Sequence, residues 1–270
     1  MSVTIKKFDC AAAEVNRAYL IVGRKGTGKS TILFTLLKNL CTKIDYAFGM
    51  FGSRDGFERI KNSLPPDVLH RSFNATIFRN VINKLQQVSL RPGYSKITAA
   101  ILDDLAYDRG TFRSNEMREA FMNGRWLGLL LMITQQYLLD IGPDLRGQID
   151  YVFALGETSR KTRQKLYDYY FGVFNSFADF DRVFTQVTSK KGRALVLDNT
   201  ISTTKITDRV FYFDGVVDLE GFVIGNDRFR SHLTTERTKK TNSLTCSSLK
   251  ASIDGHQGRS GPRHQGRREP

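Results

Sequence analysis

Eight consecutive residues, Gly23 to Ser30, have the types and the spacing of a phosphate-binding loop. Their sequence, GRKGTGKS, is a complete G-x-x-x-x-G-K-[ST] motif. Such a loop wraps its backbone N–H groups around the phosphates of a nucleoside triphosphate; Lys29 then reaches the β- and γ-phosphates, and the Ser30 hydroxyl holds Mg²⁺. The expected nucleotide-binding residues are Gly23, Arg24, Lys25, Gly26, Thr27, Gly28, Lys29, Ser30 and Thr31.

Two adjacent acids supply the second half of the expected chemistry. The segment 99–104, AAILDD, is an apolar strand pattern that ends in Asp103 and Asp104. Asp103 occupies the Walker B position, where a carboxylate holds the Mg²⁺ shell of a bound nucleotide. Asp104 follows directly and can polarise a water as general base. Without the P-loop, the same pattern would indicate only a strand that ends in a polar turn.

A third polar group follows the next apolar run, 127–133, which leads into Thr134-Gln135-Gln136. A polar side chain at the end of the strand beside Walker B would face the γ-phosphate. We expect Gln135 to sense the γ-phosphate, the alternative being a polar residue that only caps a buried strand.

The elements that must position these residues alternate along the chain. Apolar runs of strand length alternate with helix-like stretches, and most of these runs are rich in β-branched or aromatic residues. This pattern is typical of an α/β fold with a mostly parallel sheet and helices on both faces. Strands after residue 190 could pair antiparallel. The expected strands are 19–22, 44–51, 97–102, 127–133, 151–155, 194–197 and 210–213, and the expected helices are 28–41, 74–89, 113–123, 136–146, 159–171 and 177–187.

Composition divides the chain into a P-loop ATPase domain, 1–229, and a basic tail, 230–270, too poor in apolar residues to fold alone. The net charge is +14, of which +6 lies in the tail and +8 in the body. This charge favours a nucleic-acid partner over a merely solubilising surface. No DNA-reading module is evident, so we expect DNA contacts from the tail or from segments such as 54–71 and 190–193.

No apolar run is long enough for a transmembrane segment, and no secretion signal is evident.

The series Gly124-Arg125, Gln135, Arg146 and Asp150, following the P-loop and the Asp-Asp pair, resembles the FtsK–HerA superfamily. Within it, the chain resembles the poxvirus-like genome-packaging ATPases of large double-stranded DNA viruses. The resemblance covers roughly residues 15–215. It implies a RecA-like, ASCE-type P-loop NTPase that uses ATP and Mg²⁺, assembles into a homo-oligomeric ring and pumps double-stranded DNA into a capsid. The chain departs from the group at Trp126, where a histidine usually stands.

The resemblance also implies an arginine that reaches the γ-phosphate of a neighbouring subunit. Arg125 is the first candidate and Arg146 the second, with a surface salt bridge as the alternative for each. Expected partners are duplex DNA, further copies of the chain, and capsid or inner-membrane virion proteins, at virion assembly sites in the host cytoplasm or in the virion. The alternatives are a cellular translocase or helicase of the same superfamily, a small P-loop nucleotide or metabolite kinase, and a nucleotide-dependent adaptor.

Overall fold

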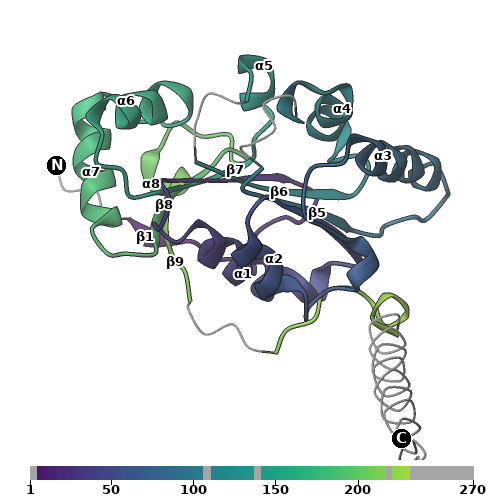
Figure 1. Cartoon of the computed structure of the whole chain (residues 1–270). Coiled ribbons are helices and arrows are strands. Elements are labelled where there is room, and N and C mark those ends of the chain that lie inside the picture. Colours follow the sequence, from purple (N-terminus) through teal and green to yellow (C-terminus); the bar gives the residue numbers. More distant parts are fainter. Residues whose placement is uncertain (1–4, 106–110, 137–140, 217–220, 232–270) are drawn as a thin grey trace, which may run out of the picture.

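The structure is a computed structural model, and it describes residues 5–105, 111–136, 141–216 and 221–231. Over these residues nine strands form one sheet, in the order β1-β9-β8-β7-β2-β6-β5-β3-β4, with helices on both faces (Figure 1). The strands are β1 (Lys6–Lys7), β2 (Ala18–Val22), β3 (Tyr46–Phe51), β4 (Leu69–His70), β5 (Thr98–Asp103), β6 (Leu129–Gln135), β7 (Tyr151–Leu155), β8 (Arg193–Asp198) and β9 (Val210–Asp214).

The predicted fold class is confirmed. Strands β2 to β7 pair in parallel, and β8 pairs antiparallel with both β7 and β9, in agreement with the expectation for strands after residue 190. The two-residue strand β1 extends the sheet by pairing in parallel with β9. Sequence patterns missed β1 and β4 because two residues show no periodicity.

Helices cover the two faces unequally. The cluster that contains the buried residues of α1 and α2 packs on one face, and the cluster that contains those of α3 to α7 packs on the other. The helices are α1 (Lys29–Leu40), α2 (Arg54–Ile60), α3 (Ala75–Ser89), α4 (Asn115–Asn123), α5 (Pro143–Arg146), α6 (Arg160–Tyr169), α7 (Phe177–Thr188) and α8 (Ile206–Arg209). Short 3₁₀ turns span Cys41–Lys43, Pro66–Val68 and Thr111–Arg113.

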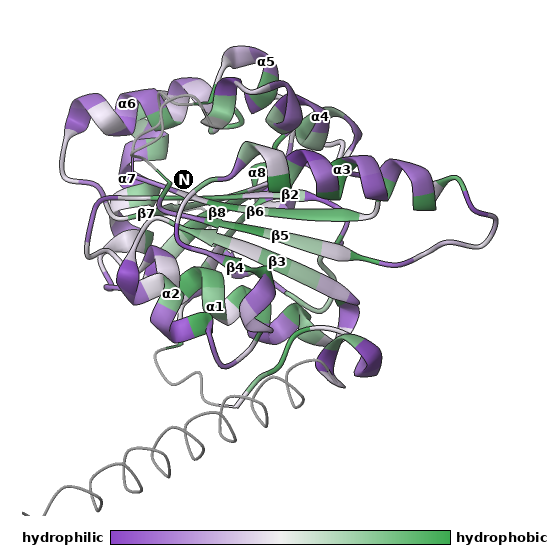
Figure 2. Cartoon of the chain, turned by 45° about the vertical axis from the view of Figure 1, so that its right-hand side comes forward, coloured by the Kyte–Doolittle hydropathy of each residue, from purple (hydrophilic) through white to green (hydrophobic). Residues whose placement is uncertain are grey.

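The central strands are apolar because helices bury both of their sides. Every residue of β2, β5, β6 and β7 is buried, so these strands read as continuous apolar runs. The covering helices turn polar faces outward, as the colouring of Figure 2 shows for α3 and α4. Side chains of serine or asparagine cap the N-termini of α2, α3, α4, α6 and α7.

One predicted helix differs from the structure. The expected helix 136–146 is reduced to α5, Pro143–Arg146, within the described residues, while 137–140 lie outside them. Gly142 has φ −62° and ψ 157°, an extended conformation, because the residue before a proline is disfavoured in the helical region. The described chain continues to Ser231, two residues past the expected domain boundary, and the tail 232–270 lies outside the described residues.

The strand order positions the candidate site. β6 lies between β2 and β5, so the carboxyl ends of these three parallel strands meet at one edge of the sheet. In open α/β sheets this edge is where ligands bind. The P-loop follows β2, the two acids stand at the end of β5, and the Thr-Gln-Gln run stands at the end of β6.

Candidate nucleotide-binding site

The P-loop connects β2 to α1, as predicted, and its glycines are required by geometry. Gly26 and Gly28 have φ values of 80° and 105°, a region that side chains disfavour. A Cβ atom on Gly23 would lie 2.8 Å from the Thr27 hydroxyl oxygen and 2.9 Å from Leu155 Cβ. The loop therefore turns tightly against the end of β7 before α1 begins at Lys29.

Lys29 is held inside the loop. Its ammonium group donates to the backbone carbonyl of Arg24 at 3.3 Å, and the residue is only 7% exposed. Burial lowers the pKa of Lys29, while the nearby charges of Asp104 and Asp103 act in the opposite direction. A buried ammonium next to two carboxylates and backbone N–H groups suits a phosphate chain with bound Mg²⁺.

Asp103 is fully buried at the end of β5 and only half satisfied. Its Oδ1 accepts a hydrogen bond from the Thr134 hydroxyl at 2.6 Å, and its Oδ2 has no partner among the described residues. Burial raises the pKa of Asp103, opposed by the hydrogen bond from Thr134. An orphaned buried acceptor at the end of β5, beside the P-loop edge of the sheet, fits the expected magnesium role, because a cation or its water would satisfy it. The Ser30 hydroxyl, in the first turn of α1, has no hydrogen bond within the described parts of the chain and fits the same role.

Thr134 links the two acids, a connection that the sequence did not indicate. Its hydroxyl oxygen accepts the backbone N–H of Asp104 at 2.9 Å while it donates to Asp103. Asp104 has φ 53°, a strained value for a residue with a side chain. Both of its carboxylate oxygens accept from the Gln136 amide, at 2.7 and 2.9 Å. The expected base is thus held at the P-loop edge by a fixed turn and by one glutamine.

That glutamine is Gln136, whereas the sequence prediction assigned the sensing role to Gln135. Side chains alternate along β6, so Gln135 follows Ile133 toward the face covered by α3 to α7, and Thr134 faces α1. Gln135 is 4% exposed, and neither atom of its amide has a partner among the described residues. Its backbone carbonyl accepts from Gly23 at 3.2 Å. The expected role of Gln135 toward the γ-phosphate stays a prediction.

Arg125 lies at the opposite edge of the sheet, before β6 begins. Its guanidinium donates to Asp150 Oδ1 at 2.6 Å, and the Arg125 side chain is 62% exposed. Asp150 Oδ2 accepts the backbone N–H of Ala18, the first residue of β2. The five residues of β2 span roughly 17 Å, so Arg125 does not reach the P-loop of its own chain. Its expected role toward a neighbouring subunit stays a prediction, and the exposed Trp126 lies beside it in the chain.

Arg146, the second candidate, is engaged within its own chain. Its guanidinium carbon lies 3.6 Å from the centroid of the Tyr169 ring, and its Nε donates to the carbonyl of Ile141 at 2.9 Å. These contacts fix the short helix α5 on α6. The structure therefore does not bring Arg146 together with the P-loop residues, and a role in trans stays a prediction.

The described residues lack two further features. They contain no group of three or more histidine, cysteine, aspartate or glutamate side chains arranged to hold a metal. None of the helices described has the length and apolar character needed to cross a membrane.

The chain is similar to proteins of several viruses. It is 28% identical over 193 residues to uncharacterised protein 088R of Invertebrate iridescent virus 3, covering 72% of this chain and 73% of the relative. It is 26% identical over 222 residues to uncharacterised protein L437 of Acanthamoeba polyphaga mimivirus, covering 77% and 76%. No protein-family model matches the chain.

Solved structures of ATPases share the fold. The genome-packaging NTPase B204 of Sulfolobus turreted icosahedral virus 2, in complex with ATPγS, aligns with a TM-score of 0.52 at 17% identity over 76% of this chain and all of that one. The EssC ATPases 2 and 3 of Geobacillus thermodenitrificans align at 0.52 and 16%, over 85% and 45%. The pCW3 conjugation coupling protein TcpA aligns at 0.53 and 16%, over 83% and 66%.

The fold and the site thus define a RecA-like P-loop protein. The predicted resemblance to the FtsK–HerA group and its viral packaging ATPases is confirmed at the level of the fold by these neighbours.

Proposed function

We propose that this protein is an ATP-driven double-stranded DNA translocase that packages a viral genome into a capsid. The observation that carries the proposal is the meeting of three groups at one sheet edge. These are a buried P-loop lysine, a buried aspartate with an unpartnered oxygen, and a second aspartate held at the mouth of the same site. That set supplies the cation, the metal-holding carboxylate and the base that hydrolysis of a Mg–nucleotide complex uses.

In the proposed reaction, water attacks the γ-phosphorus of ATP and the bond to the β–γ bridging oxygen breaks, which leaves ADP and phosphate. Asp104 accepts the proton of the attacking water. Lys29 and the P-loop N–H groups stabilise the negative charge on the phosphates. Asp103 and the Ser30 hydroxyl would hold the Mg²⁺ that accompanies the substrate, which would neutralise charge on the phosphates. The Gln136 amide donates to both carboxylate oxygens of Asp104 and so orients this base.

Coupling to DNA is supported by charge and by similarity. The body of the chain carries +8 and the tail +6, which suits the phosphate backbone of a duplex. Relatives that match about three quarters of the chain come from viruses, and B204, which shares the fold, is a genome-packaging NTPase. We propose that the protein acts as a homo-oligomeric ring, against capsid or inner-membrane virion proteins, at assembly sites in the host cytoplasm.

ATP turnover measured with and without duplex DNA tests the first half of the proposal. We expect Mg-dependent hydrolysis that duplex DNA stimulates, and Lys29→Ala should nearly abolish both rates because it removes the cation that meets the β- and γ-phosphates. Phosphorylation of a small acceptor without DNA stimulation would instead indicate a P-loop kinase.

Depletion of the protein during infection tests the second half. Packaging predicts capsids that assemble without DNA, and re-expression of the wild type, but not of Lys29→Ala, should restore full particles. DNA-stimulated hydrolysis together with normally filled capsids would favour a translocase with another task, as in the conjugation coupling protein that shares the fold.

A further inference from the structure

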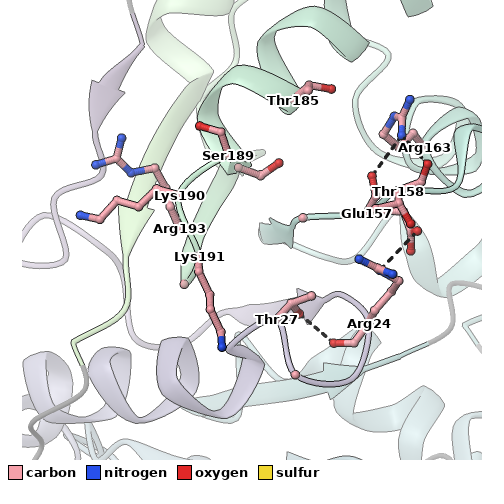
Figure 3. A pocket seen from close by; sticks show the side chains of 14 residues that line it. Arg24, Thr27, Glu157, Thr158, Arg163, Thr185, Ser189, Lys190, Lys191 and Arg193 are labelled. Atoms are coloured by element: carbon pink, nitrogen blue, oxygen red, sulfur yellow. Dashed lines mark hydrogen bonds and ion pairs between the residues drawn. The ribbon is translucent and has the colours of Figure 1, made fainter.

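A basic pocket of about 540 Å³ opens beside the P-loop (Figure 3). Its lining comes from the P-loop, the connection after β7, helices α6 and α7, and the turn before β8. The residues are Arg24, Gly26 and Thr27, then Gly156–Thr158, Arg163, Thr185, Thr188 and Ser189–Arg193. Its size suits a nucleotide-sized ligand. The structure places segment 190–193 next to the phosphate-binding loop, and its expected contact with DNA stays a prediction.

The turn before β8 is fixed against the P-loop. A Cβ atom on Gly28 would lie 3.3 Å from the Cα of Gly192, so the two backbones are close. Gly192 has φ 79°, and its carbonyl accepts the N–H of Gly215 at 2.9 Å. Arg193 adds two hydrogen bonds to Asp214, at 2.8 and 3.0 Å. A side chain that leaves this turn therefore starts from a defined position beside the phosphate site.

The cations of the pocket are not equivalent. Arg24 pairs with Glu157 at 3.6 Å, and Arg163 pairs with Asp181. Lys190 and Arg193 share Asp214, at 3.3 and 2.8 Å. This leaves Lys191, which has no ion pair or hydrogen bond within the described parts of the chain. In Figure 3 the Lys191 side chain extends toward the P-loop segment that carries Thr27, whereas Lys190 and Arg193 extend the other way.

We propose that Lys191 is a second cation for the nucleotide phosphates, supplied to the P-loop by the turn before β8. The inference rests on the proposed nucleotide binding and adds a residue outside the P-loop and Walker B motifs. The Lys191 ammonium has no counter-charge among the described residues and lies beside a loop that binds phosphate oxygens. Binding of a polyphosphate at that loop would therefore stabilise it. Lys191 then strengthens binding of the phosphates and takes no part in proton transfer, so it acts on affinity more than on the chemical step.

The test compares Lys191→Gln, which removes the charge, with Lys191→Arg, which keeps it. Lys161→Gln is the matched control, since Lys161 is exposed on α6 and does not line the pocket. Affinity for Mg–ATP, competition by inorganic pyrophosphate, the KM and kcat of hydrolysis, and duplex-DNA binding are measured for each. We expect Lys191→Gln to weaken Mg–ATP binding and pyrophosphate competition by roughly fivefold to tenfold and to raise KM alike. We expect kcat to stay within about twofold, and Lys191→Arg and Lys161→Gln to resemble the wild type.

The outcomes separate this inference from the proposed function. If the wild-type chain bound no Mg–ATP, the proposed function and this inference would both be refuted. If the wild type bound Mg–ATP and Lys191→Gln bound it equally well, only the inference would be refuted. Weaker DNA binding with unchanged ATP affinity would also overturn it and would assign Lys191 to the DNA.

Discussion

Replacing Gly56 with alanine should disable the proposed Walker B aspartate without touching it. Gly56 lies in α2, and a Cβ atom added to it would stand 2.2 Å from Asp103 Oδ2 and 2.9 Å from the Ser53 hydroxyl oxygen. Contacts of a Cβ below 3.0 Å are essentially never seen, so the carboxylate or the helix must move by about 0.8 Å or more. Asp103 has little room to move, because it is fully buried and its other oxygen is held by Thr134.

Two magnitudes follow from this overlap. Overpacking of a tight interior costs roughly 1–3 kcal/mol, which for a domain of this size lowers the Tm by roughly 2–12 °C. A displacement of about 1 Å at a group that positions the reacting atoms costs roughly 10²-fold in rate. We therefore expect Gly56→Ala to remain folded, to melt a few degrees lower and to hydrolyse Mg–ATP roughly 100-fold more slowly.

The assay is steady-state ATP turnover, paired with thermal melting by circular dichroism. Gly172→Ala is the matched control, because a Cβ at Gly172 meets no atom within 4 Å. The control should keep the wild-type rate and Tm. Gly56→Ala with wild-type turnover would refute the reasoning that Asp103 must hold its present position against α2. A variant that melts lower yet turns over normally would limit the role of Gly56 to packing.

Three further predictions concern the acids, the ring and the tail. Asp104→Asn should keep Mg–ATP binding but cut turnover by roughly 10²-fold, whereas Asp103→Asn should also weaken Mg-dependent binding; equal losses of binding would contradict the division of roles. If Arg125 acts in trans, Arg125→Ala subunits mixed with wild type should lower activity by more than their fraction, and Arg182→Ala, an equally exposed paired arginine, should not; a strictly proportional loss would argue against it. A chain truncated after Ser231 should bind duplex DNA with a shallower dependence on salt, because it loses tail charge, and should keep basal ATPase activity; loss of that activity would make the tail part of the folded domain.

The phosphate-binding half of the site could be predicted from the sequence because it is a local structure. Gly23, Gly26 and Gly28 fit the tight turn within one eight-residue run, and the strand and helix that flank it follow directly. The central strands could also be predicted from the sequence, because a strand that is buried on both faces needs a continuous run of apolar residues. The alternation of strands and helices then predicted the parallel sheet.

The side chains that lie next to the P-loop were decided only by the tertiary structure. Their positions depend on the order and register of strands that are far apart in the chain. The pairing of Asp103 with Thr134 across β5 and β6 fixes which side chains face α1, and it sets Gln136 rather than Gln135 on Asp104. From the sequence, the positive charge of segments 54–71 and 190–193 indicated only a possible contact with DNA. The fold places Gly56 against Asp103 and the Gly192 turn against the P-loop, contacts between residues more than 40 positions apart that no local pattern encodes.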